Sequence, residues 1–172
     1  METTILSAAE LKSPAVYPSY LIFNLNHRLL VNCLEGITEE QATTRISETS
    51  NSLIWMATHI VWARFNTIKL LGGNPDNPYN GLFEKFKPFD PADTYPTLSA
   101  VKAEWDKATE LLKKALQHVT EGHLATPPPF TPPTGDNSIG GAIIFLSQHE
   151  SFHIGQMAFL KKYFTKSSMS YK

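Results

Sequence analysis

The chain is poor in cysteine, in surplus charge and in long apolar runs, and each shortage excludes a class of protein. One cysteine, Cys33, in 172 residues excludes an internal disulfide framework and suits a reducing cytosol. A net charge of −1 without a basic tract offers no electrostatic footprint for nucleic acid. The most apolar stretch, Leu53 to Leu71, is interrupted by His59, Arg64 and Lys69, and it is therefore not a membrane span. The N-terminus lacks the basic and apolar regions of a signal peptide. We expect one cytoplasmic domain over residues 1–172, without nucleic-acid or membrane partners.

Apolar residues recur at helical intervals in four long stretches, and no stretch alternates in the manner of a β-strand. Glycines at 36 and 72–73 follow the first two stretches as stop signals. Thr38 to Gln41 has the form of a capping box, which predicts a short additional helix. The sequence therefore predicts an all-α four-helix bundle. Its long helices are expected at Tyr17–Glu35, Leu53–Leu71, Leu98–Thr120 and Ile139–Phe164.

Two proline-rich connections separate the later helices. Asn74 to Pro96 holds five prolines with aromatic residues between them, and the aromatics require a surface on which to pack. So long a connection acts as a crossover between helices 2 and 3, which lets these helices run parallel. Thr126 to Pro133 also holds five prolines. We interpret it as a stiff return along the bundle rather than a ligand for a proline-recognition module.

Three histidines carry the chemistry that the sequence suggests. His149 and His153 are one helical turn apart, on a stripe that Leu146 and Met157 continue, so their imidazoles can hold one ion. His59, in the middle of the most apolar helix, is the best-placed third ligand. The alternative is three core histidines satisfied by hydrogen bonds. Three imidazoles with an open position are typical of a catalytic site, and neutral nitrogen donors suit zinc or nickel.

Read literally, residues 149–153 form H-E-x-x-H, the helix motif of zinc peptidases, in which Glu150 would be the general base. The context argues against this hypothesis, because no Asp, Glu or His follows His153 to act as a downstream third ligand. Glu150 also lies about 100° around the helix from His149. We therefore expect its carboxylate at the rim of the site or in solvent.

His59 in its Met56-to-Ile60 context, followed by His149-x-x-x-His153-x-Gly155-Gln156, resembles the DinB/YfiT-like family of metal-binding bundles. The resemblance covers nearly the whole chain. It implies an up-down-down-up bundle, often a homodimer, with a divalent ion on the three histidines and water completing the shell. Some relatives are thiol-dependent S-transferases or isomerases. The resemblance also suggests that Gly155 permits close helix approach and that Gln156 orients a ligand or bonds across the core.

The leading hypothesis is a metal-dependent enzyme, a transferase or hydrolase, acting on a small molecule such as a low-molecular-weight thiol. Trp55, Trp62, Phe152 and parts of the first proline-rich connection are expected to form its pocket walls. A non-catalytic binding or stress-response module, with a structural metal or none, is the second hypothesis. A metallopeptidase using Glu150 is the third.

Overall fold

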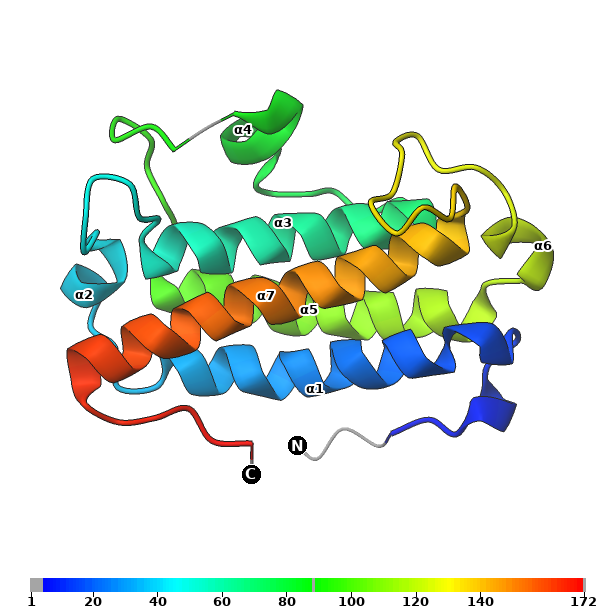
Figure 1. Ribbon diagram of the computed structural model, residues 1–172, viewed down its shortest axis with the longest axis horizontal. Coiled ribbons are helices and arrows are strands. Elements are labelled where there is room, and N and C mark those ends of the chain that lie inside the picture. The colour runs from blue at the N-terminus through cyan, green and yellow to red at the C-terminus, as the bar shows by residue number, and fades with distance from the viewer. Residues whose placement is uncertain (1–4, 88, 172) are drawn as a thin grey trace.

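Four long helices form the body of the structure, as the apolar periodicity predicts (Figure 1). The structure is a computed structural model that describes residues 5–87 and 89–171. Pro88, one of the prolines of the first connection, lies outside the described residues, as do residues 1–4 and 172. Within the described part there is no β-strand. The long helices are α1 (Tyr17–Leu34), α3 (Leu53–Leu70), α5 (Leu98–His118) and α7 (Ile139–Thr165).

The helices run in the up-down-down-up order. In Figure 1, α1 and α7 run from right to left, whereas α3 and α5 run from left to right. Helix α3 packs against α5 and α7, and α1 packs against the same two helices, so the four surround one core. The parallel arrangement of α3 and α5 requires the chain to return the full length of the bundle between them. The first proline-rich connection makes that return along the outside of α3.

Local signals set the ends of the helices. Thr38 and Gln41 form the expected capping box at the start of α2 (Glu39–Thr43). Ser52 and Ser138 cap α3 and α7 by accepting hydrogen bonds from backbone amides of the first turn. Gly72 follows α3 with φ +91°, a conformation that L side chains rarely adopt, which explains why a glycine ends this helix. The weak helical pattern near the N-terminus yields only the short 3₁₀ turns η1 (Ala8–Glu10) and η2 (Pro14–Val16).

The first proline-rich connection and the short helix before the second one both bond to α3. The first contains α4 (Asn80–Phe83) and η3 (Glu84–Phe86), and the Trp62 indole N–H donates to Asn80 Oδ1 at 3.1 Å. The second is preceded by α6 (Glu121–Leu124), whose His123 Nε2 lies 2.7 Å from the carbonyl oxygen of Leu70. His123 is therefore half-buried, and it holds α6 against the end of α3.

Cys33 is a thiol of the core. Its side chain is fully buried on α1, and burial raises its pKa to about 11. A protonated, enclosed thiol is a poor nucleophile, so the chemistry of this protein lies elsewhere. No helix in the described part of the chain combines the length and the apolar character needed to cross a membrane.

Candidate metal centre

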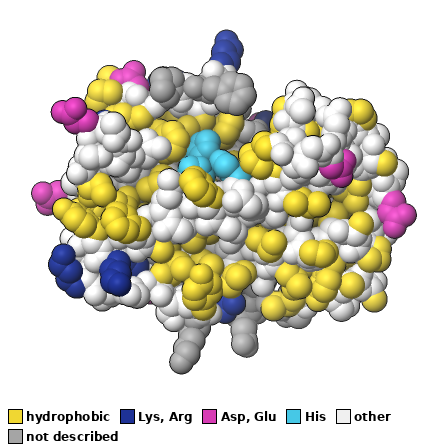
Figure 2. Space-filling model, viewed as in Figure 1, with side chains coloured by type: hydrophobic (Ala, Val, Ile, Leu, Met, Phe, Trp, Pro, Cys, Tyr) yellow, Lys and Arg dark blue, Asp and Glu magenta, His cyan; other side chains and the backbone are white. Residues whose placement is uncertain are grey.

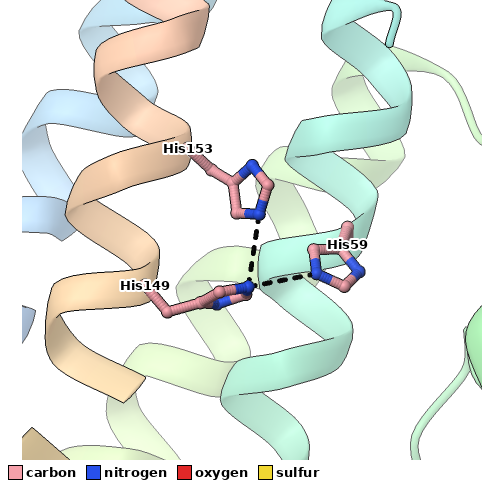
Figure 3. Close-up of side chains that lie close together, drawn as sticks. All are labelled: His59, His149 and His153. Carbon is pink, nitrogen blue, oxygen red and sulfur yellow. Dashed lines mark hydrogen bonds between the residues drawn. The ribbon is translucent and has the colours of Figure 1, made fainter. Parts of the chain in front are cut away.

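The three predicted histidines meet between α3 and α7. Figure 3 shows His149 and His153, one turn apart on α7, pointing toward His59 on α3. His149 Nε2 lies 3.3 Å from His59 Nε2 and 3.2 Å from His153 Nε2. One candidate ligand atom from each of the three rings lies within 4.8 Å of the others. Residues 90 positions apart in the sequence thus present their nitrogen atoms to one point.

These distances suit a small divalent ion. Zinc–nitrogen bonds of about 2.0–2.1 Å in tetrahedral geometry place neighbouring donor atoms roughly 3.3 Å apart. The two contacts of His149 already have this length. The donor set therefore fits a borderline ion such as zinc or nickel, and three protein ligands leave one tetrahedral position free.

Aromatic side chains hold the His59 ring in place. The ring stacks on Trp55 at 5.0 Å and on Trp62 at 5.6 Å between centroids, and Phe83 of α4 meets it edge-on at 5.1 Å. Trp55 and Trp62 flank His59 because residues at i−4 and i+3 lie on the same helix face. Phe83 comes from the first connection, so part of that connection builds the site.

The outer nitrogen atoms of the histidines differ in their partners. His153 Nδ1 lies 2.8 Å from Gln156 Oε1, which requires the proton on Nδ1 and leaves the Nε2 lone pair for the shared centre. Nδ1 of His59 and Nδ1 of His149 are buried without a hydrogen-bond partner in the described structure. An ion held by the Nε2 atoms would not bond these two Nδ1 atoms, so they are unsatisfied buried polar groups with or without a metal. A shared ion would give every ring one strong partner.

Burial keeps the histidines neutral, which is the state that binds a metal. Desolvation, followed by the neighbouring imidazoles, lowers the pKa of His59 to about 3. Desolvation and His153 lower the pKa of His149 to about 4. The pKa of His153 is lowered by desolvation and raised slightly by its bond to Gln156. At neutral pH no proton competes with a cation for these nitrogen atoms.

Glu150 does not lie at the rim of the site, and that expectation was wrong. Its side chain is buried and forms a bidentate pair with Arg64, with Nε–Oε1 at 2.8 Å and Nη2–Oε2 at 2.6 Å. Asn26 Nδ2 of α1 donates to Oε2 at 3.3 Å. Burial raises the pKa of Glu150, whereas the Arg64 guanidinium and the Asn26 amide oppose that rise. The 100° step from His149 therefore turns this carboxylate into the bundle core.

Arg64 continues this polar network to the other helices. It donates to Thr109 Oγ1 of α5 at 2.6 Å and to the backbone carbonyl of Phe23 on α1 at 3.1 Å. Its guanidinium carbon lies 3.4 Å from the centroid of the Trp105 ring. Sequence reasoning missed this network, although an arginine inside an otherwise apolar helix was a usable signal, because a buried charge requires a partner.

A pocket of about 770 Å³ adjoins the histidines, and its lining includes His59 and His149. In Figure 2 the histidines are visible at the base of a hollow bordered by hydrophobic side chains. Trp55 and Trp62 line it as expected, together with Phe83 of the first connection and Phe130 of the second. The pocket therefore depends on both proline-rich connections.

Two expectations for the α7 surface were wrong. Phe152 is 55% exposed and faces a separate hollow beside Ile46 and Phe159, so it is not a wall of the pocket. Gly155 lies in the same separate hollow, and a Cβ atom placed on it would meet nothing within 4 Å. Among the described residues, no helix therefore approaches α7 closely at Gly155.

Comparisons with known proteins agree with this architecture. A conserved protein from Enterococcus faecalis has a similar solved structure, with a TM-score of 0.67 and 16% sequence identity. The match covers 88% of this chain and 98% of that one, and at this identity it shows the fold alone. No curated protein sequence matches the chain. The family model of the DinB superfamily matches residues 22–157, which include all three histidines and most of the bundle. The chain therefore belongs to the DinB superfamily.

Proposed function

We propose that this protein is a divalent-metal-dependent enzyme that acts on a small molecule in the pocket beside His59 and His149. The observation that carries the proposal is the convergence of three neutral imidazoles at the edge of a cavity of about 770 Å³. His59, His149 and His153 would hold the ion, with zinc or nickel best suited to the nitrogen donors. A purely structural site would be closed by a fourth protein ligand.

The metal and the protein have separate tasks in this proposal. A bound divalent ion supplies Lewis acidity and lowers the pKa of a water or thiol that reaches its free position. Gln156 fixes the tautomer of His153, and Trp55 and Trp62 fix the plane of His59. The mostly apolar walls lower the polarity around the reacting groups, which strengthens electrostatic interactions there. A thiol-dependent transfer reaction, implied by the family resemblance, suits this combination.

The contacts of Glu150 argue against the metallopeptidase hypothesis. Both carboxylate oxygens accept hydrogen bonds from Arg64, and the side chain lies in the bundle core rather than in the pocket. A general base must be within hydrogen-bond reach of the proton that it removes. The non-catalytic hypothesis gains no comparable support, because the histidines border an accessible pocket instead of a sealed core.

Metal content tests the proposal first. The protein would be purified without a metal-affinity tag, incubated with zinc, and measured by elemental analysis beside the variants His149→Ala and His118→Ala. We expect about one equivalent of zinc in the parent and in His118→Ala, whose histidine is exposed at the end of α5, and loss of zinc in His149→Ala. If His149→Ala still bound about one equivalent of zinc, the proposal would be overturned.

The free coordination position can be tested with cobalt. The protein would be loaded with Co²⁺ and titrated with cysteine as a small thiol. A thiolate that reaches the ion produces a near-ultraviolet charge-transfer band, and His149→Ala should abolish it. If adding cysteine did not change the spectrum of the cobalt-loaded parent, the proposal that a thiol binds the ion would be wrong. The proposal of a metal site would be unaffected.

We also propose that the protein works in the cytosol as a homodimer. The single buried thiol suits a reducing compartment. Ile144, Phe152, Phe159 and Tyr163 expose apolar side chains on α7, and they supply a face on which a second copy can pack. Sedimentation equilibrium of the parent and of Phe159→Glu would test the dimer, since the charge should shift the molecules toward monomers.

A further inference from the structure

One face of α3 runs the length of the pocket. His59, Trp62, Asn66 and Lys69 follow one another at intervals of three and four residues, and all four line the pocket. At a rise of 1.5 Å per residue, the ten steps along the helix from His59 to Lys69 span roughly 15 Å. The pocket is therefore elongated, with the metal centre at one end and an ammonium group at the other.

The walls between these two ends are apolar. Leu70 and Ala63 of α3, Phe145 and Leu146 of α7, and Pro129 and Phe130 of the second connection complete the lining. Such walls favour a hydrocarbon body, at about 25 cal/mol for each Å² of apolar surface removed from water.

The charged groups in the described lining of the pocket are two lysines. Lys87 Nζ lies 2.5 Å from Asp93 Oδ1, so its charge is already balanced within the chain. The Lys69 side chain is exposed and makes no hydrogen bond or ion pair with the described residues. Lys69 is thus a cation at the end of an apolar pocket that lacks an internal counter-ion.

We propose that the pocket selects an elongated amphipathic substrate whose metal-binding group meets the three histidines and whose far end carries an anionic group for Lys69. The inference rests on the metal-dependent function proposed above and names the substrate class of the same site. A thiol at one end of an alkyl chain and a carboxylate at the other satisfies all three parts of the pocket.

Tryptophan fluorescence can measure the selection directly, since Trp55 and Trp62 line the pocket whereas Trp105 is fully buried elsewhere. Zinc-loaded protein would be titrated with ω-mercaptododecanoate and with ω-mercaptododecanol, both below their micelle concentrations. The two probes share the thiol and the chain and differ in the anionic end. We expect the carboxylate to bind about fivefold more tightly, the size of an exposed ion pair near 1 kcal/mol.

Two lysine variants test whether Lys69 causes the tighter binding of the carboxylate probe. Lys69→Gln should bind both probes equally, whereas Lys162→Gln, an exposed lysine near the end of α7, should keep the preference. Equal affinity of the parent for the two probes, binding of neither probe, or a preference that survives in Lys69→Gln would overturn the inference. Zinc stoichiometry measured on the same samples separates this failure from failure of the metal site itself.

Discussion

Replacement of Glu150 by alanine should destabilise the whole bundle rather than remove a catalytic base. The change leaves the Arg64 guanidinium buried, with an exposed fraction of 0%, and without its carboxylate partner. Removing one partner of a buried ion pair typically costs about 3–5 kcal/mol, out of a total unfolding free energy of about 5–15 kcal/mol. For a chain of this size each kcal/mol corresponds to roughly 2–4 °C, so Tm should fall by about 6–20 °C.

Urea denaturation followed by circular dichroism would measure this loss through the transition midpoint. The matched control is Glu104→Ala on α5, whose carboxylate pairs with Lys107 at 3.2 Å near the surface. Exposed pairs contribute only about 0–1 kcal/mol, so this control should remain close to the parent. The double variant Arg64→Met/Glu150→Leu should recover much of the lost stability, because well-packed apolar residues often replace a buried pair without loss.

Folded Glu150→Ala should still bind about one equivalent of zinc, because its carboxylate is not a ligand candidate. An unfolding free energy within about 1 kcal/mol of the parent would refute this account of Glu150, since the typical cost of an unpaired buried charge is larger. If that stable variant also lost a metal-dependent hydrolysis, the general-base hypothesis would be restored.

The histidines and Cys33 give three further predictions, on pH, on zinc and on thiol labelling. Because burial lowers the pKa of His59 to about 3 and of His149 to about 4, below the 6.5 of an unperturbed histidine, the unfolded chain binds more protons. The unfolding free energy of the metal-free protein should therefore fall as pH drops from about 6.5 toward 4, and urea titrations at several pH values would contradict this with a flat profile. Zinc at 100 times its Kd should stabilise the parent by about 2.7 kcal/mol and leave His59→Ala unchanged in calorimetry. Cys33 should react with a thiol reagent such as 5,5′-dithiobis(2-nitrobenzoate) only as fast as the protein opens, so rapid labelling under native conditions would argue against a core thiol.

Much of the site was predictable because its signals are local. Two imidazoles one turn apart share a helix face whatever surrounds the helix, and His149 and His153 required no knowledge of the fold. His59 followed from its place in the middle of an apolar helix, and the structure brings it to the predicted neighbours. Capping residues such as Thr38 and Ser52 marked helix starts, because their hydrogen bonds span only three residues.

The partners of Glu150 were not predictable in the same way. The helical rotation predicts that Glu150 points about 100° away from His149, but it does not predict which element lies in that direction. Arg64 and Asn26 reach the carboxylate from α3 and α1, over sequence separations of 86 and 124 residues. Phe83 and Phe130 likewise reach the pocket through the paths of two connections, and the proline content of these connections predicted stiff segments but not where they pack.

The sequence by itself determined the four helices, their order, and the histidine pair with its third candidate, because periodicity and capping act within a few residues of the chain. Only the tertiary structure decided which helices meet, and therefore that Glu150 serves a buried ion pair and that Phe152 stays outside the pocket. Those outcomes depend on the rotation and register of helices packed side by side. Contacts between helices distant in the sequence set both quantities, so neither can be predicted from the residues of one helix alone.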